Sequence, residues 1–148
     1  MIRVTKLLGA AVLVLLSGSP PLADGGRGRL VIEIVGFQSS SGSVKVALWN
    51  NAKSFLVSDD YVARGEGTIA ELTARVILED IPHGEYAVSV FHDENDNGKL
   101  DTGFMRIPKE PIGTSNNARG RFGPPKYRDA RFDFETAELQ LTIDLQSL

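Results

Sequence analysis

The stretch "IPHGEYAVSVFHD", from Ile81 to Asp93, carries the clearest structural pattern in the sequence. Pro82 and Gly84 predict a tight turn at its start, because proline fixes one backbone dihedral and glycine adopts turn conformations that other residues avoid. Beyond the turn, bulky apolar residues occupy every second position, at Tyr86, Val88 and Val90. A period of two is typical of a half-buried β-strand, so we expect a strand that ends at the polar residues after Phe91.

Similar β patterns extend to both sides of this stretch. Residues 29–37 ("RLVIEIVGF") are rich in β-branched side chains, and residues 43–50 ("SVKVALWN") alternate. The Ser/Gly turn between them predicts a hairpin, and residues 131–145 ("RFDFETAELQLTIDL") predict a terminal hairpin. Residues 68–81 ("TIAELTARVILEDI") contain good helix formers, but their β-branched residues favour one or two strands.

About seven short strands and no convincing helix predict an all-β fold, a single antiparallel β-sandwich. A small barrel is the alternative. The 148 residues suit one domain. Residues 51–67 show little periodicity, and within them Phe55, Leu56 and Tyr61 are candidates to anchor a loop over a sheet edge.

The first 23 residues have the composition of a secretory signal peptide. Arg3 and Lys6 precede an apolar run, and the small and turn-forming residues of "SPPLADGG" follow it. The apolar run is shorter than the roughly 20 residues that a membrane-spanning helix needs, although an uncleaved anchor is the alternative. We therefore expect a signal peptide at 1–23, a mature domain at 24–148, a periplasmic or secreted location, and no integral membrane segment after cleavage. The chain has no cysteine, hence no disulfide.

Charge is distributed unevenly along the predicted mature chain. Residues 24–103 hold 7 basic and 13 acidic residues, whereas residues 104–131 hold 7 basic and 2 acidic residues. The last segment, 132–148, has 4 acidic residues and no basic one. An acidic, exported chain whose basic segment lacks a known motif argues against nucleic-acid binding.

The stretch "FHDENDNGKLDTG", residues 91–103, follows the predicted strand directly and matches the first half of a calcium-binding loop. Short side chains with hard oxygens recur at every second position, and glycine permits a sharp bend that turns the next carbonyl toward an ion. The candidate metal ligands are Asp93, Asn95, Asn97, the backbone carbonyl of Lys99, and Asp101.

One ligand of the full calcium loop is missing from this stretch. Phe104 stands where an EF-hand has its bidentate glutamate, and the flanking segment is a strand rather than a helix. The last carboxylate must come from elsewhere, with Glu94, Asp96 and Glu110 as possible donors. The alternative is a metal-free turn, because Asn and Asp also satisfy loop backbone groups. Zinc is disfavoured, since His83 and His92 are the only histidines and cysteine is absent.

A long segment without periodicity, residues 108–130, contains most of the basic residues of the 104–131 segment. Loops of this length are uncommon in compact domains and are often functional. Phe122 and Tyr127 are expected to pin the segment to the body of the protein. Its basic residues either dock on the acidic loop, bind an anionic small molecule, glycan, phosphate, lipid head group or envelope component, or form a solvated surface. The candidate ligand-binding residues are Arg119, Arg121, Lys126 and Arg128, with Arg131 next to them.

Three motifs give the sequence a family resemblance. Residues 84–101 match "G-x-Y-A-x-x-x-x-H-D-x-N-x-N-G-x-L-D", residues 107–117 end in "G-x-S-N-N", and residues 122–125 read "F-G-P-P". Together they resemble an uncharacterised family of exported bacterial proteins, a domain of unknown function. The strand before the acidic loop is also similar to prealbumin-like and carboxypeptidase regulatory-like sandwiches. The resemblance implies a prealbumin-like or Ig-like fold and a calcium loop, but no activity. Arg106 departs from the family, which tends to carry glycine there.

The function expected from these observations is a non-enzymatic, exported β-sandwich binding module with a calcium-stabilised loop. An envelope structural or assembly protein is the first alternative, and long flat edge strands would favour it. A hydrolase that uses His92, Asp93 and Ser115 is the second alternative. It is disfavoured because Ser115 lies in no nucleophile motif and neighbouring residues of a strand point to opposite faces.

Overall fold

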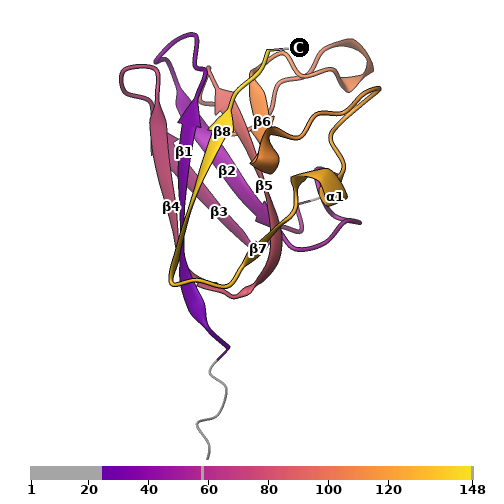
Figure 1. Ribbon diagram of the computed structural model, residues 1–148. Coiled ribbons are helices and arrows are strands. Elements are labelled where there is room, and N and C mark those ends of the chain that lie inside the picture. The colour runs from indigo at the N-terminus through magenta and orange to yellow at the C-terminus, as the bar shows by residue number, and fades with distance from the viewer. Residues whose placement is uncertain (1–24, 58, 148) are drawn as a thin grey trace, which may run out of the picture.

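The computed structural model describes residues 25–57 and 59–147, so the predicted signal peptide lies outside the described residues. The described chain is built of strands in two facing sheets, joined by long loops and three short helical segments (Figure 1). The strands are β1 (Arg27–Val35), β2 (Ser43–Trp49), β3 (Ala63–Thr68), β4 (Ala74–Pro82), β5 (Gly84–Asp93), β6 (Ile112–Thr114), β7 (Phe132–Phe134) and β8 (Glu138–Asp144). The helical segments are η1 (Phe104–Arg106), η2 (Ser115–Asn117) and α1 (Tyr127–Ala130).

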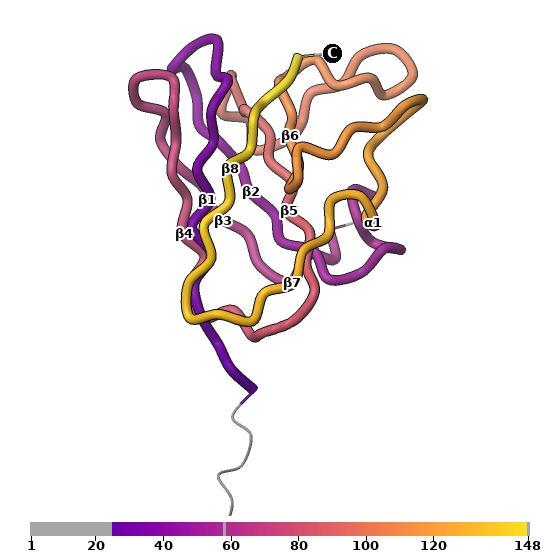
Figure 2. Tube along the Cα trace, in the orientation of Figure 1, coloured from indigo at the N-terminus to yellow at the C-terminus, as the bar shows by residue number. Residues whose placement is uncertain are grey.

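The first sheet has the strand order β4-β1-β8, and the second has the order β3-β2-β5-β6 with β7 also paired to β5. The trace in Figure 2 shows the first and last strands, β1 and β8, side by side. This pair is parallel, whereas the other pairs are antiparallel. The predicted all-β sandwich is therefore confirmed, with one parallel pair as a difference.

The hydrophobic core lies between the two sheets. Alternate residues of β1, β2, β4 and β5 face it, and Phe134 and Ile143 close it from β7 and β8. The alternation predicted for β5 holds, because Tyr86, Val88 and Val90 are all buried. Each fully buried aliphatic or aromatic side chain contributes about 1.5–3 kcal/mol relative to exposure, so the pattern of period two accounts for the sheet-on-sheet packing.

Both predicted hairpins are wrong. β1 and β2 lie in different sheets, joined by a loop over residues 36–42 in which Gly36 and Gly42 have positive φ values of 86° and 70°. A seven-residue loop is too long for the tight two-residue turn that pairs neighbouring strands, and this one buries Phe37 while crossing between sheets. Likewise β7 pairs with β5 and β8 with β1, so no terminal hairpin forms.

Strand β3 occupies residues that the sequence pattern left unassigned. Its core-facing positions include Gly65 and Gly67, so no bulky apolar residue marks the buried face. A side chain at Gly65 would meet Val76 and Leu78 of β4 at 2.6 and 2.9 Å. Glycine is therefore required where β3 approaches the facing sheet. The prediction that residues 68–81 contain a strand and not a helix is confirmed, because β4 begins at Ala74 within this region.

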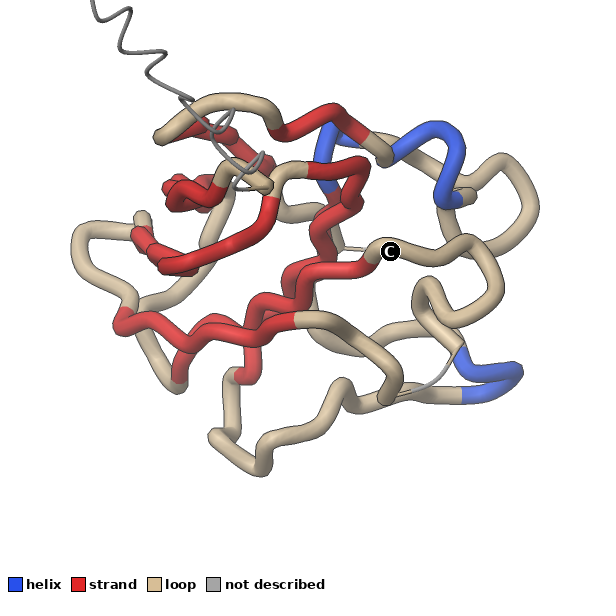
Figure 3. The backbone as a smooth tube through the Cα atoms, turned by 90° about the horizontal axis from the view of Figure 1, so that it is seen from below, coloured by secondary structure: helices blue, strands red, loops and turns tan. Residues whose placement is uncertain are grey.

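Long loops and the short helical segments fill one side of the molecule, whereas most strands lie toward the other side (Figure 3). Two of these connections, residues 94–111 and 115–131, contain the acidic loop and the basic segment. No helix in the described part of the chain has the length and apolar character required to span a bilayer.

A Gly65→Val substitution tests the close approach of the two sheets. Because the added side chain meets Val76 and Leu78, we expect the free energy of unfolding to fall by about 1–3 kcal/mol, the usual cost of overpacking a core. Urea unfolding followed by circular dichroism measures this change. The neighbouring exposed position provides the control, and Arg64→Ala should change stability by less than about 0.5 kcal/mol. Equal stability of Gly65→Val and the parent would contradict the packing described.

Candidate functional site

One edge of β5 pairs with β2 along nearly its whole length, while its other edge is divided between two short strands. β6 pairs with Ser89–Phe91, and β7 pairs with Gly84–Tyr86. The hydroxyl of Ser115 fills the gap between them, because its Oγ accepts a hydrogen bond from the Val88 backbone N–H at 2.9 Å. The same hydroxyl donates to the Ala130 carbonyl. Ser115 is fully buried and continues the strand edge with its side chain.

The two asparagines after Ser115 extend this arrangement. The Asn116 amide donates to the carbonyls of Asp129 and Arg131 at 3.2 and 2.8 Å, which holds α1 in place. Asn117 accepts a hydrogen bond from the Asp144 backbone N–H at 2.9 Å and so ties the loop to β8 of the other sheet. Both asparagines have positive φ values, 58° and 47°, a conformation that asparagine tolerates better than most residues. The Ser-Asn-Asn motif is a structural clamp, a role the sequence analysis missed.

The residues of the hydrolase alternative are not brought together. Ser115 bonds to Val88, four residues from His92 along an extended strand, a separation of about 13 Å. The His92 Nε2 atom lies 2.7 Å from the Ser41 carbonyl, and its ring packs edge-on against Phe37. His92 therefore fastens the loop between β1 and β2 to the end of β5.

Asp93 forms the base of the acidic loop, defined here as residues 93–101. Its side chain is fully buried, and its two carboxylate oxygens accept backbone N–H groups from Asn97 at 3.0 Å and Gly98 at 2.8 Å. Gly98 has a φ of 78°, as the sharp bend predicted there requires. The Lys45 ammonium lies 3.9 Å from the same carboxylate. The loop thus curls around the Asp93 carboxylate.

The side chains of Asn95, Asn97 and Asp101 meet on the exposed side of the loop. The Asn95 and Asn97 amide groups donate to the two carboxylate oxygens of Asp101 at 2.7 and 3.0 Å. Their amide oxygens accept the backbone N–H groups of Asn97 and Lys99 at 3.2 and 2.8 Å. Asp93, Asn95, Asn97 and Asp101 therefore make side-chain hydrogen bonds within one loop, to which Lys99 contributes its backbone N–H.

Glu110 closes the acidic loop from outside it. Its carboxylate is buried and accepts the backbone N–H groups of Glu94 and Asp101 at 3.0 and 2.9 Å, so it holds both ends of the loop. The other two candidates for the last metal ligand have different partners. Asp96 accepts a hydrogen bond from the Ser43 hydroxyl at 2.7 Å, and a Glu94 carboxylate oxygen lies 3.7 Å from the His92 ring. Among the three, Glu110 is the one that contacts both ends of the acidic loop.

Carboxylates alone do not make a metal site in this region. Across residues 25–57 and 59–147, no group of three or more His, Cys, Asp or Glu side chains is arranged to hold a metal ion. A cation at the acidic loop would therefore depend on amide and backbone carbonyl oxygens, which suit Ca²⁺ rather than zinc. His83 and His92 flank opposite ends of β5, about 30 Å apart, so they cannot share a zinc ion.

In the described part of the chain, the basic side chains of the 115–131 connection form no ion pair with the acidic loop. Arg119, Arg121, Lys126 and Arg128 are all exposed. Within the described residues, the ion pairs of the segment join Arg128 to Asp129 and Arg131 to Glu85, and none reaches the acidic loop. The prediction that Tyr127 anchors the segment is confirmed, since its ring is buried against Phe55. The same prediction for Phe122 is wrong, because that ring is fully exposed.

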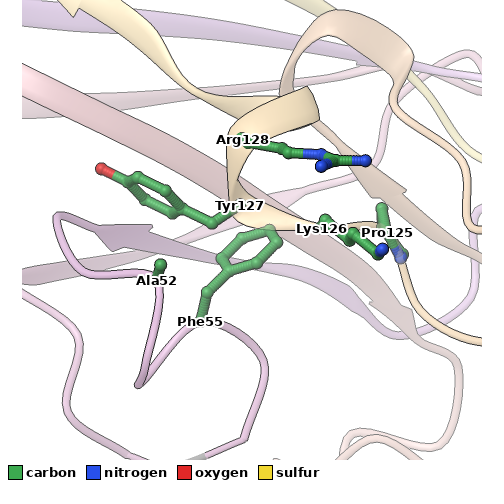
Figure 4. Close-up of a pocket in the computed structure, with 6 residues that line it drawn as sticks. All are labelled: Ala52, Phe55, Pro125, Lys126, Tyr127 and Arg128. Atoms are coloured by element: carbon green, nitrogen blue, oxygen red, sulfur yellow. The ribbon is translucent and has the colours of Figure 1, made fainter.

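A hollow of about 270 Å³ lies beside α1, where the basic segment meets the loop after β2. Figure 4 shows Phe55 directed toward Tyr127, with the charged ends of Lys126 and Arg128 on the side away from the tyrosine hydroxyl. Burial, and then the nearby Glu85 carboxylate, raise the pKa of Tyr127. The hollow therefore combines a neutral aromatic floor with two cations. Of the four predicted ligand-binding residues, it contains Lys126 and Arg128, whereas Arg119 and Arg121 lie outside it.

A Ser115→Ala substitution separates a structural hydroxyl from a catalytic one. Removing the hydroxyl leaves the buried Val88 N–H and Ala130 carbonyl without a partner, which costs about 1–3 kcal/mol of the free energy of unfolding. Urea unfolding measures this loss, and Ser40→Ala at an exposed position is the control. A Ser115→Ala variant as stable as the parent would contradict the clamp.

The comparisons with known proteins agree with the resemblance of the motifs. No curated protein and no solved structure gives a match to the chain. The model of one family, described as an uncharacterized protein conserved in bacteria (DUF2141), matches residues 32–142. This range runs from β1 to β8 and includes the acidic loop, the Ser-Asn-Asn clamp and the basic segment. The chain therefore belongs to this uncharacterised bacterial family, DUF2141.

Proposed function

We propose that the protein is an exported β-sandwich binding module whose acidic loop, residues 93–101, binds Ca²⁺. The observation that carries the proposal is the meeting of Asn95, Asn97 and Asp101 on one side of the loop. A hard cation placed between them would bind the Asp101 carboxylate in place of the two amide N–H donors. The amide groups would then turn their oxygens toward the cation. Asp93 and the Lys99 carbonyl would complete a set of oxygen ligands of the kind that Ca²⁺ prefers.

The charge of the loop supports a divalent cation. Residues 93–101 contain four acidic side chains, and Lys99 is the one basic residue among them. Like charges held close together repel one another, and a bound cation relieves this repulsion. Ca²⁺ would therefore stabilise the folded loop more than the unfolded chain, in which these charges are further apart.

Hydrogen bonds to two buried carboxylates hold the frame of the loop in place. The buried carboxylates of Asp93 and Glu110 accept four backbone N–H groups of the segment. A preorganised loop loses little conformational entropy on binding, which favours affinity. With one strong bidentate ligand missing, we expect a dissociation constant of about 10⁻⁴–10⁻³ M, in the range of extracellular calcium modules.

Export is inferred from the composition of residues 1–23, which begin with two cations and continue as an apolar run. Every strand and helical segment among the described residues lies between Arg27 and Asp144. A chain that starts at Asp24 therefore contains the complete sandwich and is suitable for experiments. The exported form needs no disulfide, because the core between the two sheets and the clamps around β5 hold it together.

The ligand of the module is proposed to be an anion with an apolar part. The hollow beside α1 offers Phe55 and Tyr127 as its floor, with Lys126 and Arg128 next to them. A phosphate or carboxylate would contact the two cations, and an apolar or sugar ring would lie on the aromatic floor. The acidic loop lies between β5 and β6, and the basic residues of the hollow lie between β6 and β7. The two sites share no residue, so binding at each can be measured separately.

Thermal unfolding of the chain from Asp24 tests the calcium proposal. At 10 mM Ca²⁺ the expected affinity gives about 1.4–2.7 kcal/mol of added stability, so Tm should rise by several degrees relative to EDTA. Asp101→Asn should abolish the rise without lowering Tm in EDTA. Asp96→Asn removes the same charge from the same loop outside the ligand set, and it should retain most of the rise. No rise in the parent protein, or equal loss in both variants, would overturn the proposal.

Fluorescence of Trp49 tests the anion site. Trp49 is the one tryptophan of the chain, and its ring contacts Phe55, whose ring contacts Tyr127 at the hollow. We expect a sugar phosphate to change the emission with saturation, and Lys126→Ser with Arg128→Ser to weaken its binding at least about tenfold, as loss of two charge-assisted contacts implies. Arg64→Ser is the control. An unchanged titration in the double variant would count against this ligand site.

A further inference from the structure

The most exposed aromatic side chains of the described chain lie in the two connections that follow β5. Phe104, Met105 and Ile107 expose 86%, 78% and 52% of their surface, and Phe122 is fully exposed. The first three form one apolar tip on the 101–110 loop, and Phe122 forms the tip of the basic segment. Contiguous exposed apolar groups of this size mark interaction sites more often than chance exposure does.

Both tips carry basic residues beside the apolar ones. Arg106 stands between Met105 and Ile107, and Arg119 and Arg121 precede Phe122. In the part of the chain that the structure describes, none of these three arginines takes part in an ion pair. Their charges are therefore available to a partner, and that partner must be negative.

The first tip is held in a fixed shape. The Gly103 N–H donates to the Ile107 carbonyl at 2.7 Å, and the Lys109 N–H donates to the Asp101 carbonyl at 2.9 Å. Met105 and Arg106 have φ values of 54° and 58°, in the left-handed region that non-glycine residues avoid. A strained backbone that persists at an exposed tip is typical of sites where presentation of side chains matters.

We propose that these two tips dock on an anionic lipid surface, with Phe104, Met105 and Phe122 inserting between head groups. Arg106, Arg119 and Arg121 would contact lipid phosphates. Apolar and aromatic tips surrounded by cations suit the boundary between head groups and acyl chains. Phe104, Met105 and Phe122 are largely exposed, so they suit insertion into a soft surface.

The figures support a joint contact. Figures 1 and 2 show both loops on the right side of the molecule, while the β3–β4 turn that contains Leu72 lies on the left. Both tips therefore lie on the same side of the molecule in this view, as contact with one surface requires. This inference goes beyond the proposed function and requires neither calcium nor the hollow beside α1.

Co-sedimentation with lipid vesicles tests the proposal. The chain from Asp24 is mixed, in EDTA, with vesicles of phosphatidylcholine or with vesicles that also contain phosphatidylglycerol. EDTA removes Ca²⁺, so the result does not depend on the calcium proposal. We expect binding to the anionic vesicles that weakens with added salt, and at least about tenfold weaker binding to the neutral ones.

Variants of exposed residues identify the contact. Phe104→Ser with Phe122→Ser, and separately Arg106→Gln with Arg121→Gln, should each weaken vesicle binding about tenfold or more. Leu72→Ser is the matched control, because Leu72 is 47% exposed on the opposite side. Thermal unfolding must be unchanged in all variants used. Absence of binding to anionic vesicles, or equal binding by the Phe104→Ser, Phe122→Ser variant and the parent, would overturn the proposal.

Discussion

The edge of β5 that faces away from β2 is the constraint on which the rest of this structure depends. A buried strand cannot leave its backbone N–H and C=O groups without partners, and three separate segments supply them. β6 pairs with the second half of the strand, β7 with its start, and the Ser115 hydroxyl with Val88 between them. The chain must leave the sheet after β5 and again after β6 to make these contacts. The acidic loop and the basic segment lie in these two connections.

This arrangement explains why the two charged regions are adjacent in sequence yet distinct in structure. The acidic loop is fastened to the sandwich by buried carboxylates, Asp93 at its start and Glu110 beyond its end. The basic segment is fastened by the buried ring of Tyr127 and by the Asn116 amide. Each connection is thus anchored by buried or hydrogen-bonded groups and not by its exposed charges. Among the exposed charges of the described chain, those of Arg106, Arg119 and Arg121 form no ion pair and can meet a ligand or a surface.

The sequence predicted those features that depend on local pattern. The alternation of β5 and the Asp-Asn-Asn-Gly spacing led to a strand and a curled loop, and both are present. Features that depend on distant partners were not predictable. The sequence around Gly36 and Gly42 does not reveal that the chain changes sheets, and Gly65 gives no apolar signal for β3. The same limit applies to the choice of Glu110 over Glu94 and Asp96, because the partners of Glu110 lie 9 and 16 positions away. Arg106, where the resemblance leads us to expect glycine, has a φ of 58°.

The central claim is that the acidic loop is a calcium site built from amide and carboxylate oxygens. Nuclear magnetic resonance tests it most directly, through the side-chain amide signals of Asn95 and Asn97 and the backbone amide of Gly98 during a Ca²⁺ titration. We expect saturable shifts at these signals in the millimolar range, with little change at exposed carboxylates elsewhere, such as Glu71 and Asp133. Unchanged signals from Asn95 and Asn97 at saturating Ca²⁺, or shifts spread evenly over the exposed carboxylates, would contradict it.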